Sequence, residues 1–185
     1  MLDEQIIELF FERSEQAISE LDGKYGKLLR NLSYNILNDR LDAEECVNDS
    51  YLGAWNVIPP ERPNPLLTFV CKIVRNISIK KYHTKTAIKR NSTYDVAMSE
   101  IANYILSPNN VEAEIEAKEL ARMIEEFLET LTVENRVIFM RRYWFSDTYK
   151  DIADRVGITE KMVSMRLTRI RKQMREYLMK REVLV

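Results

Sequence analysis

The chain has 185 residues, with 28 lysines and arginines against 29 aspartates and glutamates, so its formal net charge is −1 at pH 7. This length is enough for one domain with a large core or for two smaller domains. The four glycines form no nucleotide-binding loop, the two cysteines form no metal-binding pair, and the single histidine offers no framework for nucleophilic catalysis. We therefore expect no enzyme activity, no catalytic residue, no cofactor and no metal site.

Charge is strongly segregated along the chain. Residues 1–63 hold 13 acidic and 6 basic side chains, residues 72–90 hold 7 basic and no acidic ones, and residues 91–135 hold 10 acidic and 2 basic ones. Basic modules favour nucleic-acid binding, and the acidic stretches indicate either a protein partner or screening of the basic faces. The chain opens without a basic leader, and no apolar run reaches the length of about 18 residues that is needed to span a bilayer. We therefore expect a cytoplasmic protein without a membrane partner.

Two helices are expected at the N-terminus, because apolar residues recur there at helical spacing. The first covers residues 3–12. The second runs from a predicted cap at Ser14 to about Leu37, and Gly23 and Gly26 leave open a break within it.

A third helix is predicted over residues 42–58, with a capping pair of Asp42 and Glu45 at its start and a stop at Pro59. Its outer face is polar. Glutamates in the first turn are explained by the helix dipole, whereas Asp49 lies beyond that turn and favours a partner. The remaining polar residues of this face are Glu44 and Asn48.

A fourth helix is predicted over residues 66–85, where basic residues alternate with aromatic ones. This combination suits stacking on unpaired bases beside a groove that follows the phosphates. For Phe69 alone, packing in the core is an equally good interpretation. The outward polar residues are Lys72, Arg75, Asn76, Lys80 and Lys81.

Periodicity fades over residues 91–110, which we interpret as a linker with room for a short helix over 95–106. Helical spacing resumes over 111–130 and again over 135–145. The pattern predicts an all-α protein with two helical modules.

The stretch from Thr148 to Tyr177 predicts a helix-turn-helix. Thr148 caps a short helix that Gly157 ends, and Thr159 caps a second helix. Apolar residues recur along that second helix at Val163, Leu167, Ile170, Met174 and Leu178. Residues 160–181 hold eight basic and two acidic side chains, which favours DNA contact over the alternative of a solvated face in a bundle.

Several segments, in their order and spacing, resemble one protein family. They are residues 42–49 with Ala54 and Trp55, 69–76, 131–139, 149–153 and 169–171. The first two resemble the D-A-E-D-x-V-Q-E…A-W and W-L-x-x-I-A-R-N signatures of sigma region 2. The others resemble the L-P…R-x-V-F, Y-x-E-I-A and R-A-R signatures of region 4. The family is that of RNA polymerase sigma factors of the extracytoplasmic function (ECF) type, within the sigma-70 family.

The resemblance implies a fold of two small helical domains. Region 2 would cover residues 1–90, a linker 91–110, and the helix-turn-helix of region 4 residues 111–185. The implied function is to bind core RNA polymerase and direct promoter-specific initiation at −35 and −10 elements, assisting promoter melting. The implied partners are core RNA polymerase, through its β′ clamp helices and β flap, promoter DNA, and an anti-sigma factor.

Three groups of contacts follow from the resemblance, residue by residue. Core polymerase would bind Glu45, Asn48 and Asp49. The −10 element would meet Asn76 at a strand-separated base, with Phe69, Lys72, Arg75, Lys80 and Lys81. The −35 element would be read at its base edges by Ser164, Met165, Thr168 and Arg169, with Arg166 and Arg171 toward phosphate, beside Lys161 and Lys172.

The chain departs from the family signatures at three places. Phe69 stands for the family's Trp, Asn48 and Asp49 for its Gln-Glu pair, and residues 161–165 for its G-T-V-x-S turn. The third departure changes the recognition surface, so the promoter sequence is not predicted. The alternative function is a helix-turn-helix repressor or activator with an N-terminal sensing or dimerisation module, which would not require the basic patch at 72–90.

Overall fold

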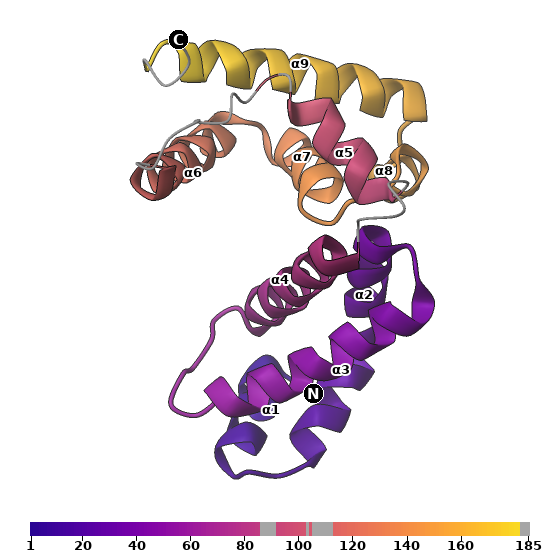
Figure 1. The fold of residues 1–185 in the computed structure, drawn as a ribbon, viewed down its shortest axis with the longest axis vertical. Helices are drawn as coiled ribbons and strands as arrows, with labels where there is room; N and C mark the ends of the chain where they lie inside the picture. The colour runs from indigo at the N-terminus through magenta and orange to yellow at the C-terminus, as the bar shows by residue number, and fades with distance from the viewer. Residues whose placement is uncertain (86–91, 103, 105–112, 182–185) are drawn as a thin grey trace. The chain divides into compact units, whose positions relative to one another are not determined.

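The computed structural model describes residues 1–85, 92–102, 104 and 113–181 of the chain. All regular structure within these residues is α-helical, which confirms the predicted all-α fold. The chain divides into two units, Met1–Tyr94 and Asp95–Val185, and each is described by itself (Figure 1).

The first unit is a helical bundle. It contains α1 (Asp3–Phe11), α2 (Gln16–Leu37), α3 (Arg40–Val57) and α4 (Leu66–Lys85). The last three pack against one another, and α1 lies against α2. The core between them is built from fully buried apolar side chains at helical spacing, among them Ile6, Phe10, Leu21, Leu29, Ile36, Leu66, Val70 and Val74.

Helix α2 is continuous, so the break considered at its two glycines does not occur. Gly26 is buried beneath the ion pair of Asp22 and Arg30, whose nitrogen and oxygen lie 2.7 Å apart. A Cβ at Gly26 would come within 2.1 Å of the Asp22 carboxylate, so the close approach of this ion pair explains the glycine. The cap predicted at Ser14 is wrong: the N-cap is Glu15, and no side chain caps the helix there.

The capping pair predicted at Asp42 and Glu45 is also wrong. Helix α3 begins two residues earlier, at Arg40, because Asp39 has the extended backbone of an N-cap. The Asp39 carboxylate accepts hydrogen bonds from the backbone N–H groups of Leu41 and Asp42, at 2.9 and 3.0 Å. Asp42 is thereby free to bind cationic groups of α4.

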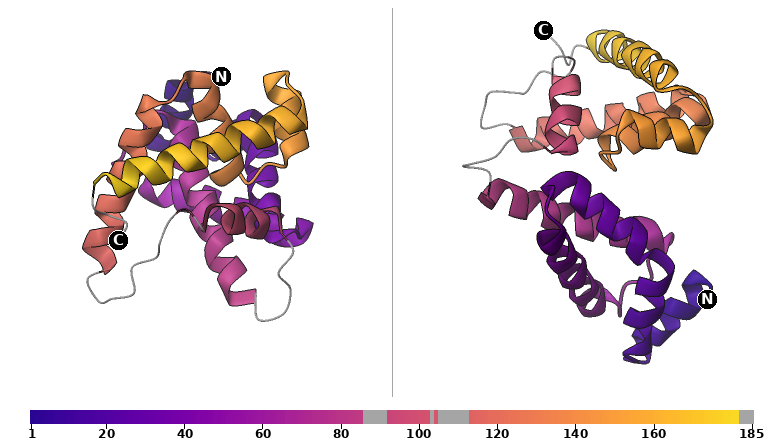
Figure 2. Two further views of the ribbon diagram at one scale, coloured as in Figure 1. Left: turned by 90° about the horizontal axis from the view of Figure 1, so that it is seen from above. Right: turned by 90° about the vertical axis from the view of Figure 1, so that its right-hand side faces the viewer.

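The second unit contains most of α5 (Thr93–Ala102), and α6 (Ala113–Thr130), α7 (Val133–Tyr143), α8 (Tyr149–Val156) and α9 (Glu160–Met179). Helix α9 extends along the unit from α8 at its N-terminal end to α6 at its C-terminal end (Figures 1 and 2). Its five predicted apolar positions are all buried in the core of this unit.

Helix α5 occupies part of the segment interpreted as a linker, close to the short helix expected there; the rest of that segment, apart from residues 92 and 104, lies outside the described residues. This helix is not solvated on all sides. Ala97 is fully buried in the core of the second unit, and Met98 and Ile101 pack against that core. The second unit therefore includes α5 as a packed element.

Candidate nucleic-acid interface

The helix-turn-helix has the local geometry that its sequence predicts. Thr148 accepts a hydrogen bond from the backbone N–H of Asp151 (3.1 Å), and the Asp151 carboxylate accepts one from the backbone N–H of Thr148 (3.2 Å). Gly157 ends α8 with φ +74°, a conformation that strains other residues. Thr159 then caps α9 by accepting from the backbone N–H of Met162 (3.3 Å). Both caps and the turn are confirmed.

Burial fixes how α8 and α9 lie against each other. Ile152 and Ala153 of α8 and Val163 of α9 are buried in one core. Each fully buried aliphatic side chain contributes about 1.5–3 kcal/mol, so this packing holds the outer face of α9 in place relative to α8. The arrangement supports one exposed helix, as DNA-reading helices require.

The outer face of α9 presents a stripe of exposed side chains at positions i, i+4, i+7 and i+11. These are Lys161, Met165, Thr168 and Lys172, and Arg169 lies exposed beside them. Met165 is 58% exposed, so nothing within the unit covers the middle of this stripe. Ser164 is half-buried. A helical stripe with cationic ends has the shape and charge to enter a major groove.

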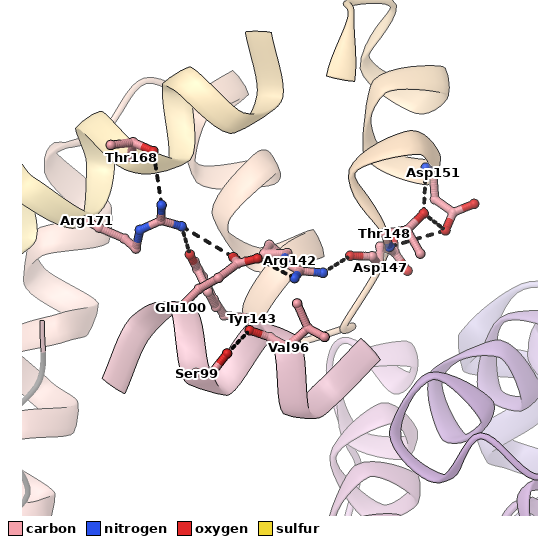
Figure 3. A network of polar contacts seen from close by, with 10 residues as sticks. All are labelled: Val96, Ser99, Glu100, Arg142, Tyr143, Asp147, Thr148, Asp151, Thr168 and Arg171. Carbon is pink, nitrogen blue, oxygen red and sulfur yellow. Dashed lines mark hydrogen bonds and ion pairs between the residues drawn. The ribbon is translucent and has the colours of Figure 1, made fainter. Parts of the chain in front are cut away.

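Arg171 differs from the other predicted phosphate contacts because it is buried. Its guanidinium donates to the Tyr143 hydroxyl (2.7 Å) and to Thr168 Oγ1 (3.0 Å), and it forms an ion pair with Glu100 at 3.3 Å (Figure 3). Burial raises the pKa of Tyr143 to about 12, although Arg171 opposes this shift. The guanidinium of Arg171 thus has polar partners inside the unit, and an outward phosphate contact would require breaking them.

Glu100 is the centre of this buried network. It binds Arg142 with both carboxylate oxygens, at 2.6 and 3.1 Å, and Arg142 also donates to the backbone carbonyl of Asp147 (2.8 Å) (Figure 3). Sequence reasoning missed these residues. A signal was present for Arg142, because it falls four residues after Ile138 on the buried side of α7. Glu100 joins α5 to α7 and α9, a pairing that no local pattern specifies.

In the first unit, the predicted polymerase contacts share one face of α3. Glu45, Asn48 and Asp49 are all exposed, as is Glu44. Two leucines that sequence reasoning missed extend the same helical face: Leu41 is 84% exposed and Leu52 is 59% exposed. Their spacing from Glu45 and Asn48, in steps of three and four residues, could have identified them. The face is therefore acidic in the middle and apolar toward both ends.

The predicted −10 contacts of α4 fall into two groups. Lys72, Asn76 and Lys80 are exposed and recur every four residues, and half-buried Phe69 precedes them at the same side of the helix. Arg75 and Lys81 are half-buried instead, at other positions around the helix. Burial lowers the pKa of Arg75. The structure thus brings Phe69, Lys72, Asn76 and Lys80 together on one face.

Lys81 takes part in an ion-pair cluster between α3 and α4. Its ammonium lies 2.5 Å from the Glu45 carboxylate and 3.2 Å from that of Asp42, and Lys85 also pairs with Asp42. The Lys85 ammonium, with Lys81 beside it, holds the pKa of Asp42 below its usual range. Because the Lys81 side chain is only 17% exposed, this cluster is mainly a contact between two helices.

Two general features of the described residues complete the geometry. No helix among them is long and apolar enough to cross a membrane. Within the same residues, no three or more histidine, cysteine, aspartate or glutamate side chains gather as a metal site.

Two family models match the chain. The model described as sigma-70 region 2 matches residues 21–88, in the first unit, and the model described as sigma-70, region 4 matches residues 121–174, in the second. Helices α1 and α5 lie outside both matches. No curated protein sequence matches the chain.

Among solved structures, the chain is similar to the one entitled "Structure of CnrH in complex with the cytosolic domain of CnrY". The identity is 17%, the match covers 95% of this chain and 96% of that one, and the TM-score is 0.45.

The two matched regions define a class of protein, the transcription initiation factors that bind DNA through helical domains. The chain belongs to the sigma-70 family, and the helix-turn-helix described above lies within its matched region 4.

Proposed function

We propose that the chain is a sigma factor of the ECF type that binds core RNA polymerase and directs it to promoters with −35 and −10 elements. Family membership supports the general function. The finer proposal depends on one observation, the presence of separate exposed polar faces on α4 and on α9. A protein that only reads duplex DNA needs the exposed face on α9, whereas a protein that also holds separated strands needs the faces on both α4 and α9.

Helix α9 is the proposed reader of the −35 element. Arg169 is exposed beside the central stripe, where its guanidinium can donate two hydrogen bonds to a guanine edge in the major groove. Lys161 and Lys172, at the two ends of the stripe, are proposed to bind backbone phosphates. Arg171 is left out of this set because its guanidinium is already bound to Tyr143 and Glu100. The base-edge positions proposed beside Arg169 are Ser164, Met165 and Thr168.

Helix α4 is the proposed −10 contact. Asn76 lies between Lys72 and Lys80 on the exposed face, so one amide has a cationic group on either side along the helix. An amide can bind the edge of an unpaired base while the lysines bind the flanking phosphates. Phe69 retains enough exposure on the same side to stack on a second base.

Helix α3 is the proposed docking site for core polymerase. Its acidic centre, made by Glu45, Asn48 and Asp49, favours a basic surface, which the family resemblance identifies with the β′ clamp helices; the β flap is the proposed contact of the second unit. Leu41 and Leu52 add exposed apolar area on either side, as protein interfaces commonly have. We also propose an anti-sigma factor as a competing partner.

Co-purification with core RNA polymerase tests the proposed function. The full chain is mixed with core enzyme, and the assembled enzyme selects fragments of genomic DNA from the source organism in the presence of a polyanion competitor. We expect the recovered fragments to share two short elements at a fixed spacing, and core enzyme alone is the control. Failure to co-purify with core enzyme would refute the proposal.

A repressor or activator is the alternative function, and it differs in what it requires of α4. Such a protein would bind duplex DNA through α9 without polymerase, and substitutions on the exposed face of α4 would leave its DNA binding unchanged. If substitution of Asn76 selectively reduces the formation of open complexes, that result favours the sigma factor over the repressor or activator.

A further inference from the structure

A polar hollow lies beside the proposed DNA-reading face of the second unit. It has a volume of about 230 Å³ and is lined by Arg166 and Arg169 of α9 and by residues at the start of α7. The Arg166 guanidinium forms an ion pair of 2.6 Å with the carboxylate of Glu134, one of those α7 residues. The remaining lining residues are Thr132 and Asn135.

The position of the hollow relates it to duplex DNA. Arg169 belongs both to the lining of the hollow and to the exposed residues beside the central stripe of α9. A duplex whose major groove receives that stripe must carry one of its backbones past the flank of α9 on which Arg166 and Arg169 lie. Both guanidinium groups can then donate to phosphate oxygens, the contact for which arginine is best suited.

Glu134 competes with a backbone phosphate for Arg166. Its carboxylate already binds Arg166, and a phosphate approaching the same guanidinium would be repelled by that negative charge. The Glu134 side chain is 49% exposed, so it can move into solvent without leaving a buried charge unpaired. The Arg166 side chain, 29% exposed, stays at the hollow.

We propose that this hollow binds one backbone phosphate of duplex DNA, and that Glu134 is an internal counter-ion which the phosphate displaces from Arg166. The proposal rests on the proposed function in one respect, namely that α9 binds duplex DNA. It adds a phosphate site shared between α7 and α9, and a residue that weakens DNA binding by competing with the backbone.

Displacement of Glu134 changes how strongly the affinity for DNA depends on the salt concentration. A phosphate that binds an unpaired arginine releases about one condensed cation, which contributes about −0.9 to the slope of log affinity against log salt. When Glu134 must first leave Arg166, the freed carboxylate is screened by cations from solution, and this partial uptake offsets part of the release. Neutralising Glu134 removes the uptake, so the salt slope becomes steeper as the affinity rises.

The test uses the full chain and a fluorescent duplex of mixed sequence, because a backbone contact does not depend on base sequence. Binding is measured by anisotropy at several salt concentrations for the wild type, Glu134→Gln, Arg166→Ala and the double variant. Glu125→Gln is the matched control, since Glu125 is an exposed carboxylate of α6 in the same unit. Circular dichroism verifies that every variant is folded.

We expect Glu134→Gln to tighten binding by roughly two- to fivefold at low salt, the range expected for releasing one partly exposed ion pair. Its salt slope should be steeper than that of the wild type, by at most about one unit. Glu125→Gln should change neither quantity by as much. In the Arg166→Ala background, Glu134→Gln should add little, because the site has lost the group for which the carboxylate competes.

Three results would overturn the proposal in distinguishable ways. If the wild type binds duplex with a clear salt dependence but Glu134→Gln behaves like Glu125→Gln, the counter-ion role is wrong while DNA binding by α9 stands. If Glu134→Gln tightens binding equally with and without Arg166, the effect is general electrostatics and the shared site is wrong. Absence of duplex binding by every variant would overturn the phosphate site, whereas failure to co-purify with core polymerase is the result that would overturn the proposed function.

Discussion

Lys81 of α4 lies 2.5 Å from Glu45 of α3, so a residue expected to bind DNA forms an ion pair with a residue expected to bind polymerase. The same ammonium is 3.2 Å from Asp42. A basic partner surface that binds Glu45 must compete with Lys81 for it, and Asp42 keeps Lys81 in place when it does. The first unit therefore holds its acidic face and its basic helix together through a shared cluster of charges.

The first prediction concerns the acidic face of α3. Changing Asn48 and Asp49 together to alanine should weaken binding to core polymerase, because both side chains are exposed and neither takes part in the Lys81 cluster. Adding Glu45→Ala should weaken it further. Affinity is measured by titrating labelled core enzyme with each variant. The control is Glu61→Ala, an exposed carboxylate outside α3. Equal affinity for the control and the triple variant, at unchanged helicity, would show that this face does not bind polymerase.

The second prediction is a pH dependence. Because Lys85 and Lys81 lower the pKa of Asp42 in the folded chain, its carboxylate stabilises the fold above the ordinary aspartate pKa of about 3.9. That contribution is lost as the pH falls through the lowered value. Asp42→Asn should therefore cost about 1–3 kcal/mol at pH 7 and much less in acid. Hydrogen exchange of α3 and α4 amides at neutral and acidic pH measures this difference. A penalty that stays constant with pH would contradict the assignment.

The helices and the caps of the helix-turn-helix were predictable from the sequence because they depend on neighbouring residues, whereas the caps predicted at Ser14 and Asp42 were wrong. Thr148 with Asp151, Gly157 and Thr159 fix the helix-turn-helix within a few residues of chain, and the structure has each of them as expected. The start of α3 was misplaced because Asp39, which has an extended backbone and accepts the capping hydrogen bonds, is the N-cap instead of Asp42.

The parts of the site that the sequence did not predict depend on partners far along the chain. Arg171 and Glu100 are 71 residues apart, so no helical period indicates that this arginine is buried while Arg169 is exposed. The pairing of Glu45 with Lys81 likewise depends on how α3 and α4 pack. Charge counts identified the basic helices correctly, but they treated all cationic side chains on a helix alike. In the folded chain, some of these side chains form ion pairs with residues of neighbouring helices.

The third prediction tests the buried network around Glu100. Glu100→Gln leaves Arg142 and Arg171 with an uncharged partner in a mostly buried position, so it should lower the free energy of unfolding of the second unit by roughly 3 kcal/mol. The measurement is urea unfolding followed by Trp144 fluorescence in a Trp55→Phe background. Arg122→Ala, which removes an exposed pair with Glu126, is the control and should cost less than about 1 kcal/mol. A similar small loss for Glu100→Gln would mean that α5 is not held by this network.

The fourth prediction separates two arginines of α9 that are two residues apart. Arg169→Ala should cost about 1–3 kcal/mol of promoter binding and relax base preference, because this side chain is exposed beside the central stripe. Arg171→Ala should instead destabilise the second unit, because its guanidinium is bound to Tyr143 and Glu100. Duplex titrations on selected and scrambled sequences, together with urea unfolding, distinguish the two effects. A base-specific loss at full stability for Arg171→Ala would contradict the buried arrangement.

The last prediction concerns Asn76 and the proposed role of α4 in strand separation. Asn76 is exposed between Lys72 and Lys80, so its amide is available to a base that has left the duplex. Asn76→Ala in the reconstituted enzyme should leave core binding and closed complexes nearly unchanged. It should slow the formation of open complexes by about tenfold, the scale expected from contacts worth about 1–3 kcal/mol per base.

Permanganate reactivity of promoter thymines measures the open complex, and two templates isolate the step. On a promoter whose −10 region is already mismatched, Asn76→Ala should recover much of its activity, because strand separation no longer depends on the protein. Asn31→Ala is a suitable control, since Asn31 is an exposed amide of α2 in the same unit, away from the lysine-flanked face of α4. If transcription from duplex and mismatched templates falls equally, Asn76 does not act in melting, because a residue that captures an unpaired base must matter less once the base is already unpaired.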